Sequence, residues 1–412
     1  MAGTTPSTGG RPTPRITVVG IGADGWESLP SRLRDVVTQA AVLLGGRRHL
    51  DLVPAVAGQR REPWPAPLGA GLPALLADLG DGPVVALASG DPLVSGIGTT
   101  LVDLLGADAV AVEPAVSSVA LARAAMGWPA ESHAVVSVVG RDVALVRREL
   151  APGRRVLVLS SDQRSPSDIS RLLVEAGYGA SAVTVLGDLG GTSSSRRDFA
   201  RADGLAPAEG FSRLTVVAVE CAGPDRGGWV AGLPDDVFES DGQLTKRDLR
   251  ASALARLSPR PGEHLWDVGA GAGSVGIEWM RAHPTCTATA VEADAERAAR
   301  ITRNAAALGV PGLQVVVGRA PDVLAGLPSP RAVFVGGGAT APGVLDACLD
   351  RLGAGGRLVV HAVTLETEQL LGGLHGQHGG ELVRIAVETA APVGSFTGWT
   401  PARTVTQWTL LR

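Results

Sequence analysis

The stretch "LWDVGAGAGSVGIEW" (265–279) decides the fold of the C-terminal half of this chain. A short apolar run ends in a turn that carries Gly269, Gly271 and Gly273, and Gly276 follows where a helix should begin. Glycines at such a turn let backbone N–H groups and the start of the helix come close to a ligand. The stretch therefore predicts the first strand, turn and helix of a nucleotide-binding α/β domain.

Two ligands fit these glycines. Gly271-x-Gly273-x-x-Gly276 matches the dinucleotide fingerprint of an oxidoreductase. Gly269-x-Gly271-x-Gly273 with Asp267 ahead of it is typical of a loop for S-adenosylmethionine. A carboxylate is unfavourable beside a pyrophosphate but favourable near the sulfonium and α-ammonium groups of S-adenosylmethionine, directly or through water. We therefore favour the methyl donor, and we place Gly276 inside the helix, where it allows close packing on the sheet.

Three later features extend this site. Glu292 ends the second strand in "AVEAD" and is expected to bind a ribose hydroxyl, which either ligand would offer. Ala320 in "GRAPDVL" is expected beside the adenine ring. The glycines of "FVGGGAT", Gly336 and Gly337 among them, follow the fourth strand and leave space for a large substrate. A flexible loop is the alternative for the glycines of "FVGGGAT", and Arg319 in "GRAPDVL" is open to interpretation as plain surface.

The C-terminal half alternates strands with helices in a regular order. "TATAVEAD" (287–294) predicts a strand and "AERAARITRNAAALG" (295–309) an amphipathic helix. Further strands follow in 313–317, 331–335 and 357–361, before a β-rich stretch that runs to the end of the chain. We expect a Rossmann-like domain with an extended C-terminal tail.

The N-terminal half also alternates strands with helices, but its motifs differ from those of the C-terminal half. "RITVVGIGADG", "GPVVALASGDP" and "DAVAVEPAVSS" are apolar strands that end in turns, and "RRVLVLSSD", "SAVTVLGDLG" and "RLTVVAVE" add further strands. Apolar strands that alternate with helices predict a largely parallel sheet covered on both faces. We expect a flexible tail at 1–14, one domain over 15–222, a Gly- and Pro-rich linker at 223–232 and a second domain over 233–412.

The bulk properties narrow the function classes. The 412 residues are 45% hydrophobic and only 3% aromatic, with a net charge of −4, which argues against a nucleic-acid binder. The three cysteines are too far apart for a disulfide framework or a metal cluster, so no metal is expected. Without a signal peptide or a membrane-spanning run, we expect a cytoplasmic protein that forms homo-oligomers.

The combination of motifs resembles a known enzyme family. "LPDDVFESDGQLTKRDLR", "DVGAGAGSVGIE", "AVEAD", "GRAPDVL" and "FVGGG" are similar to the C-terminal half of the decarboxylating precorrin-6Y C(5,15)-methyltransferase family. "ALASGDPLVSGIGTTL", "VEPAVSSVALARAAMGWP" and "AAVLLGGRRHL" resemble the tetrapyrrole methylases, whose fold has two α/β lobes. Departures are Ala270 and Ala272, where Cys and Thr are common, and Arg319, where an Asp is common. The resemblance implies a fused, bifunctional enzyme with a class I methyltransferase fold in its second half.

The resemblance also implies an activity, which is methylation of a corrin precursor at carbons 5 and 15 with loss of carbon dioxide from the ring C acetate. Each half would bind S-adenosylmethionine. Methyl transfer to an electron-rich carbon mainly needs positioning and exclusion of water, so no catalytic residue is singled out. A two-domain NAD(P)-dependent oxidoreductase and a non-catalytic binding module remain the alternatives.

The candidate site residues follow from the motifs and from the resemblance. The C-terminal donor site comprises Thr245, Gly269, Ala270, Gly271, Ala272, Gly273, Glu292 and Ala320, and the N-terminal one Gly90, Asp91, Ser117 and Ser118. The substrate is expected at Gly20, Gly22, Lys246, Arg247, Gly336, Gly337 and His361. Arg250 is a further cation for the carboxylates of the substrate, and Thr245 is also expected to be the N-cap of the helix that follows. A solvated helix start is the alternative for these cations, and a structural role is the alternative for His361.

Overall fold

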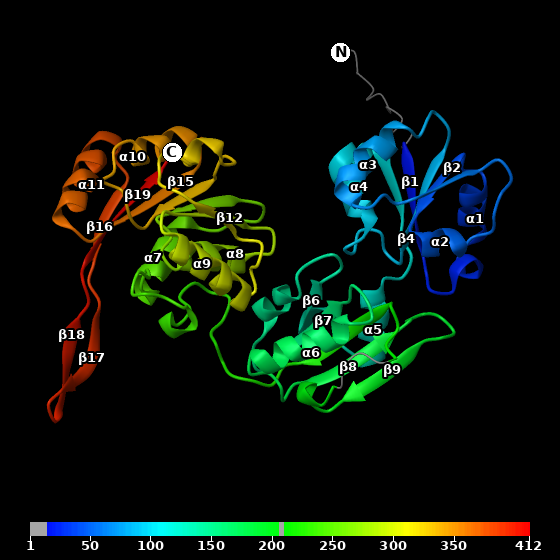
Figure 1. Ribbon diagram of the computed structural model, residues 1–412, viewed down its shortest axis with the longest axis horizontal. Coiled ribbons are helices and arrows are strands. Elements are labelled where there is room, and N and C mark those ends of the chain that lie inside the picture. The colour runs from blue at the N-terminus through cyan, green and yellow to red at the C-terminus, as the bar shows by residue number, and fades with distance from the viewer. Residues whose placement is uncertain (1–14, 206–209) are drawn as a thin grey trace, which may run out of the picture. The chain divides into compact units, whose positions relative to one another are not determined.

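The computed structural model describes residues 15–205 and 210–412, so the tail expected at 1–14 lies outside the described residues. The chain divides into two compact units (Figure 1). Unit 1 contains the described residues of 15–141 and Gly153–Ala222, and unit 2 contains Asp142–Pro152 and Gly223–Arg412. The sequence gives no sign that Asp142–Pro152 leaves the first unit, because this segment has neither a composition shift nor a linker on either side.

The first lobe of unit 1 is a parallel sheet in the order β3-β2-β4-β1-β5. Its elements are β1 (Ile16–Ile21), α1 (Ser31–Thr38), β2 (Val42–Gly45), α2 (Arg47–Asp51), β3 (Arg60–Pro63), α3 (Leu68–Ala77), β4 (Val84–Ser89), α4 (Ile97–Leu105) and β5 (Val110–Glu113). The central strands β1 and β4 are almost entirely buried, as apolar runs in a parallel sheet usually are. This lobe confirms the parallel sheet expected from the sequence.

The second lobe of unit 1 is a mixed sheet in the order β6-β7-β10-β8-β9. It contains α5 (Ser118–Met126), β6 (His133–Ser137), β7 (Arg155–Leu159), α6 (Ser165–Glu175), β8 (Ala182–Gly187), β9 (Ser195–Phe199) and β10 (Thr215–Glu220). Only β6 and β7 pair in parallel, so the expectation of a largely parallel sheet is wrong for this lobe. The connection 188–194 between β8 and β9 holds no helix, and strands joined without a crossover pair antiparallel.

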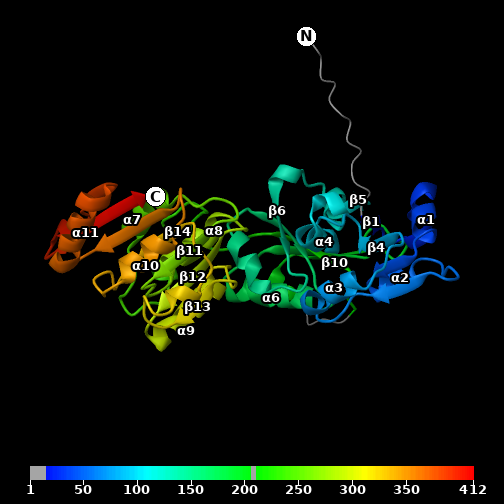
Figure 2. The same cartoon turned by 90° about the horizontal axis from the view of Figure 1, so that it is seen from above.

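Unit 2 is built on a single sheet in the order β13-β12-β11-β14-β15-β19-β16, part of which can be followed in Figure 2. Its strands are β11 (His264–Val268), β12 (Thr287–Glu292), β13 (Gln314–Val317), β14 (Ala332–Val335), β15 (Arg357–Ala362), β16 (Glu381–Ile385) and β19 (Val405–Leu411). Its helices are α7 (Arg247–Leu257), α8 (Ser274–Ala282), α9 (Ala295–Ala307), α10 (Val344–Arg351) and α11 (Leu365–His378). One apolar cluster joins α7, α8 and α9 to one face of the sheet, and another joins α10 and α11 to the opposite face.

The C-terminal stretch after β15, expected to be an extended tail, adds a helix and two strands to unit 2. β19 and β16 add to the sheet antiparallel beside β15, and α11 is a helix that the sequence analysis missed. Only β17 (Glu388–Val393) and β18 (Phe396–Pro401) extend away from the sheet, as a separate hairpin (Figure 1).

Short 3-10 turns complete the described elements: η1 (Gly25–Ser28), η2 (Ala107–Ala109), η3 (Ala130–Ser132), η4 (Val143–Glu149), η5 (Ala202–Gly204), η6 (Asp235–Val237) and η7 (Leu324–Gly326). The turn η4 lies in the excursion that belongs to unit 2, where a Cβ on Gly309 would collide with the backbone of Arg148. Over 15–205 and 210–412, every helix is too short or too polar to cross a bilayer.

Candidate functional site

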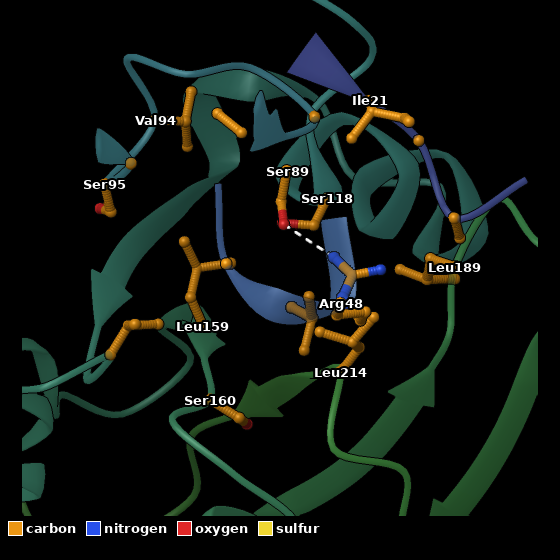
Figure 3. Close-up of a pocket in the computed structure, with 18 of the residues that line it drawn as sticks. Ile21, Arg48, Ser89, Val94, Ser95, Ser118, Leu159, Ser160, Leu189 and Leu214 are labelled. Atoms are coloured by element: carbon orange, nitrogen blue, oxygen red, sulfur yellow. Dashed lines mark hydrogen bonds between the residues drawn. The ribbon is translucent and has the colours of Figure 1, made fainter. Parts of the chain in front are cut away.

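Unit 1 contains a cavity of about 410 Å³ between its two lobes (Figure 3). The first lobe contributes Ile21 at the end of β1, Ser89 at the end of β4 and Gly90 directly after it. The second lobe contributes Leu159 at the end of β7 and Leu214 just before β10. The lining is largely apolar with a few polar groups, which is the usual character of a site for a small organic ligand.

The structure divides the predicted residues of unit 1 into two groups. Gly22, Gly90 and Ser118 line the cavity. Asp91 and Ser117 instead have local partners: the Asp91 carboxylate accepts a hydrogen bond from the Leu93 N–H at 2.9 Å, and Ser117 caps α5 through the Ala120 N–H at 3.1 Å.

Gly20 lies outside the cavity lining and serves close packing. A Cβ at this position would stand 2.6 Å from the backbone nitrogen of Ala115 and would also collide with the carbonyl oxygen of Gly90. Gly90 itself has a φ of +53°, and a Cβ there would lie 2.9 Å from the carbonyl oxygen of Val116. The end of β1 and the turn after β4 therefore pack backbone against backbone, which shapes one wall of the cavity.

A polar cluster in the same cavity was missed by the sequence analysis. His49 Nε2 lies 2.8 Å from Ser89 Oγ and 2.9 Å from one guanidinium nitrogen of Arg48. The same guanidinium nitrogen lies 3.0 Å from Ser89 Oγ (Figure 3). Burial, and then the charge of Arg48, lower the pKa of His49 to about 4. The motif "GGRRHL" contains two of the three residues, but the third lies 40 positions away from His49 and only the fold brings it there.

The glycine loop of unit 2 has the geometry that its sequence predicts. Gly269, Gly271 and Gly273 all have positive φ, at +68°, +59° and +76°, which side chains rarely adopt. A Cβ on Gly269 would lie 2.7 Å from the carbonyl oxygen of Gly337, and one on Gly271 would lie 2.7 Å from that of Gln243. These three positions therefore require glycine for both conformation and space.

Glu292 supports this loop from the end of β12. One carboxylate oxygen accepts the Gly271 N–H at 2.9 Å, and the other accepts the Asp294 N–H at 3.0 Å. Each oxygen keeps a lone pair for a further donor. Ala270 and Ala272 lie between the glycines; the Ala270 N–H donates to the carbonyl oxygen of Val291 at 3.1 Å, and Ala272 is 1% exposed.

Asp267 is buried, which corrects the direct contact with the methyl donor that the sequence analysis allowed, while the contact through water stays a prediction. Its side chain is 1% exposed, and it accepts the Gly276 N–H at 2.9 Å inside the unit. Burial, opposed in part by this bond, raises the pKa of Asp267 to about 7. A Cβ on Gly276 would lie 3.2 Å from the same carboxylate, so the prediction that Gly276 allows close packing of α8 on the sheet is confirmed.

Asn304 is a second residue that the sequence analysis missed. Its amide nitrogen donates to the carbonyl oxygens of Ala272 at 3.0 Å and of Glu239 at 2.9 Å, and its amide oxygen accepts the Glu239 N–H at 2.9 Å. The residue is 2% exposed. The amide therefore joins the glycine loop to segment 239–243, whose residue Gln243 packs on Gly271.

The cations before α7 have different environments. Lys246 and Arg247 are exposed, and the Lys246 ammonium lies 3.8 Å from Asp235. Arg250 is fully buried, pairs with Glu278 at 2.5 Å and donates to the carbonyl oxygens of Thr245 and Leu233.

Two predictions for this segment are therefore wrong. Arg250 cannot receive a carboxylate of the substrate, because its donors are bound within the core. The N-cap of α7 is Lys246 rather than Thr245, and no side chain caps the helix.

The remaining predicted residues lie around the glycine loop of unit 2. Gly336 follows β14, and its N–H donates to the carbonyl oxygen of Val268 at 3.0 Å. Gly337 lies against Gly269. Ala320 packs against the apolar cluster on the α10 side of the sheet.

His361 does not face an open cleft, which corrects the expectation. It is 8% exposed, bonds Gln407 through Nε2 at 2.9 Å and stacks edge-to-face on Phe334 with ring centroids 5.0 Å apart. Burial lowers the pKa of His361, and its ring packs as part of the core.

Comparison with known proteins covers both units. The family model described as "Precorrin methyltransferase domain" matches residues 236–412, and that described as "Tetrapyrrole (Corrin/Porphyrin) Methylases" matches residues 15–195. A Sinorhizobium protein named precorrin-6Y C(5,15)-methyltransferase [decarboxylating] is 45% identical over 96% of this chain and 96% of its own length.

Two shorter relatives carry narrower names. A cobalt-precorrin-7 C(5)-methyltransferase of Salmonella typhimurium is 36% identical over 40% of this chain and 80% of its own length. A probable cobalt-precorrin-6B C(15)-methyltransferase (decarboxylating) of Pyrobaculum calidifontis is 40% identical over 33% of this chain and 72% of its own length.

Proposed function

We propose, from the premise that this chain belongs to the family of decarboxylating precorrin-6Y C(5,15)-methyltransferases, that it methylates precorrin-6Y at carbons 5 and 15 and releases the ring C acetate as carbon dioxide. The product is precorrin-8X, an intermediate of cobalamin biosynthesis. The observation that carries the proposal is similarity to one such enzyme along almost the whole of both chains. A methyltransferase identity also favours S-adenosylmethionine over a dinucleotide at the glycine loop.

We assign the two methylations to different units, so that the chain is a fused, bifunctional enzyme. Unit 1, a two-lobed tetrapyrrole methylase, methylates carbon 5, and unit 2, a Rossmann-like class I methyltransferase, decarboxylates and methylates carbon 15. Separate relatives that are named for carbon 5 and for carbon 15 support the division. The functional domains span 15–222 and 233–412 with a linker at 223–232, except that Asp142–Pro152 packs in unit 2.

The residues of unit 2 fit S-adenosylmethionine. The loop at Gly269, Gly271 and Gly273 exposes backbone where a side chain would close the space, and Glu292 has free lone pairs for the ribose hydroxyls. Gly336 and Gly337 directly follow β14 and Ala320 follows β13, all at the carboxyl edge of the parallel strands, where ligands of such sheets bind.

The cavity of unit 1 also fits a methyl donor. Its volume of about 410 Å³ is within the range of sites for small organic ligands, and Gly90 and Ser118 offer backbone and hydroxyl groups to it. The proposal therefore holds one donor site per unit.

The bound donor would supply an electrophilic methyl group on a sulfonium. The chain has to hold the nucleophilic carbon of the tetrapyrrole in line with that methyl group and to exclude water. In unit 2, Lys246 and Arg247 would hold the carboxylates of the substrate at the exposed start of α7. Gly22 would leave the space for the tetrapyrrole in unit 1.

The cobalt form of the substrate is a second candidate, because the two shorter relatives are named for cobalt-precorrins. The proposal also includes a cytoplasmic location and a homo-oligomeric state. The three cysteines are buried and form no disulfide, which agrees with a reducing compartment.

The test is to incubate the full-length chain and two variants with precorrin-6Y and S-adenosylmethionine labelled in its methyl group. Mass spectrometry counts methyl groups and carbon dioxide loss, and NMR locates the methyl carbons. The wild type should add two methyl groups and lose carbon dioxide. Gly271→Ala should lose decarboxylation and carbon 15 methylation, whereas Gly90→Ala should lose only carbon 5 methylation. Carbon 5 methylation that survives in Gly90→Ala contradicts the assignment, and a wild-type chain that binds nicotinamide without methyl transfer contradicts the function.

A further inference from the structure

We infer that Ser89, His49 and Arg48 form a proton-accepting relay in unit 1, which removes the hydrogen that the incoming methyl group replaces at the substrate carbon. The inference rests on the proposed function, in which unit 1 methylates carbon 5. It assigns a chemical role to residues that the sequence analysis left without one.

The contacts of His49 favour one tautomer of its ring. Arg48 can only donate, and one of its guanidinium nitrogens lies 2.9 Å from His49 Nε2, which favours Nε2 as the acceptor and leaves the proton on Nδ1, a buried atom without a hydrogen-bond partner. The same guanidinium nitrogen donates to Ser89 Oγ at 3.0 Å. The Ser89 hydroxyl can therefore donate its own proton to Nε2, from which its oxygen is separated by 2.8 Å.

The charge state of the imidazole suits an acceptor. Burial is the larger cause and the Arg48 charge the smaller cause of the lowered pKa of His49, about 4, so the ring is neutral near pH 7. Burial lowers the pKa of Arg48, and the negative charge of Asp188, which also lines the cavity, partly offsets this effect. The remaining cation of the lining is Arg213, which joins the cavity from the second lobe.

The position of the relay matches the expected reacting atoms. Ser89 is the last residue of β4 and directly precedes Gly90, which forms the turn predicted to contact the methyl donor. His49 and Arg48 belong to α2, which follows the Gly45–Gly46 turn after β2, and both line the cavity. The relay therefore opens on the space where donor and tetrapyrrole have to meet.

Charge balance requires such an acceptor. The carbon uses an electron pair of its conjugated system to bond the methyl group, while the sulfonium keeps the electrons of the broken C–S bond and becomes neutral. The substrate is then a cation that still holds its original hydrogen on that carbon. Loss of this hydrogen as a proton returns the C–H electrons to the conjugated system. Ser89 accepts the proton as its own moves to His49 Nε2, and after the product leaves, the imidazolium returns a proton through the exposed Ser89 hydroxyl to solvent.

The first measurement needs no substrate. In the wild-type chain labelled with 15N-histidine, the His49 signal, assigned by its loss in His49→Gln, should report the tautomer with the proton on Nδ1. Arg48→Met should relax this preference, because the donor to Nε2 is gone. A wild-type signal with the proton on Nε2 overturns the relay.

The second measurement follows carbon 5 methylation in single turnovers. His49→Gln should slow it about 100- to 10,000-fold, the usual contribution of a general base, while calorimetric affinity for S-adenosylmethionine stays unchanged. A substrate with deuterium on carbon 5 should react more slowly than the protium form in His49→Gln. Added imidazole should restore part of the rate in His49→Gly.

The matched control is His133→Gln, a substitution of another histidine of unit 1, which lies on β6 and bonds the carbonyl oxygen of Pro129 at 2.9 Å. It should leave the rate and the isotope effect as in the wild type. If wild type methylates carbon 5 and His49→Gln does so at the same rate, the relay is wrong and the proposed function stands. If wild type never methylates carbon 5, the proposed function is wrong. The tautomer measurement still tests whether the His49 proton lies on Nδ1, as the relay requires.

Discussion

The side-chain amide of Asn304 donates a hydrogen bond to the carbonyl oxygen of Ala272 at 3.0 Å. The two residues are far apart in the sequence, one in α9 and the other in the glycine loop. The same amide also forms hydrogen bonds with the carbonyl oxygen and the N–H of Glu239, so it connects the glycine loop to segment 239–243. The loop therefore owes its shape to a helix as well as to its own glycines.

Asn304→Leu should destabilise the chain and weaken donor binding to unit 2. The substitution leaves the buried carbonyl oxygen of Ala272 without its partner, at about 1–3 kcal/mol, and removes two part-buried hydrogen bonds to the backbone of Glu239. Urea denaturation and calorimetry with S-adenosylmethionine measure the two effects. Arg303→Ala on the same helix is the control, because it removes only an exposed ion pair with Glu239 and should change neither by much. Equal effects of both variants would contradict the role of Asn304.

Gly271→Ala should abolish one of two donor sites. The new Cβ would lie 2.7 Å from the Gln243 carbonyl oxygen in a backbone with a φ of +59°. Calorimetry should give two S-adenosylmethionine molecules per wild-type chain and one per Gly271→Ala chain. The control is Gly376→Ala in α11, where a Cβ meets nothing within 4 Å and the helix should gain about 0.5–1 kcal/mol. Two sites in Gly271→Ala would show that this loop binds no donor.

Asp267 should make the stability of unit 2 depend on pH. Its pKa is about 7 in the folded chain and ordinarily 3.8, so the folded state holds an extra proton between these values. Unfolding releases that proton, and the contribution to stability, present below pH 4, is lost as pH rises through 7. Asp267→Asn keeps an acceptor for Gly276 and should therefore gain about 2–4 kcal/mol over wild type between pH 4 and pH 8.

Denaturant titrations at several pH values measure this difference. The control is Asp350→Asn on the exposed side of α10, which should follow the wild-type curve. A constant difference between Asp267→Asn and wild type from pH 4 to pH 8 would refute the prediction.

Arg250→Ala should act on stability rather than on substrate binding. It leaves the carboxylate of Glu278, which is 5% exposed, buried without its cation, a change that typically costs about 3–5 kcal/mol. Arg247→Ala at the exposed start of the same helix is the matched variant and should keep the wild-type melting temperature while it raises the KM for the tetrapyrrole. Thermal melts and steady-state kinetics separate the two outcomes. A melting temperature of Arg250→Ala close to wild type would place this arginine outside the core.

The local backbone of both sites could be predicted from the sequence. The glycine loop of unit 2, the acidic residue at the end of β12 and the packing role of Gly276 follow from the order of residue types along the chain. In unit 1, the resemblance to the tetrapyrrole methylases pointed to Gly22, Gly90 and Ser118, which line the cavity, and also to Gly20, Asp91 and Ser117, which do not. These features depend on φ, ψ and strand order, which neighbouring residues determine.

The partners of charged and polar side chains could not be predicted in this way. Asp267 accepts a hydrogen bond from Gly276, Arg250 pairs with Glu278, and His361 bonds Gln407. The sequence alone did not show this, because a carboxylate, a guanidinium or an imidazole could equally contact a ligand. The relay of Arg48, His49 and Ser89 and the bridge of Asn304 join segments that are distant in sequence.

The sequence by itself thus determined where the backbone of this protein turns and offers its N–H groups to a ligand, because glycine conformation and the succession of strand, turn and helix along the chain depend mainly on neighbouring residues. Only the tertiary structure decided which side chains face the ligand and which stabilise the core. Burial of a carboxylate or a guanidinium without a partner costs free energy. Whether a hydrogen-bond or ion-pair partner lies beside such a group depends on strands and helices that the fold brings together from elsewhere in the chain.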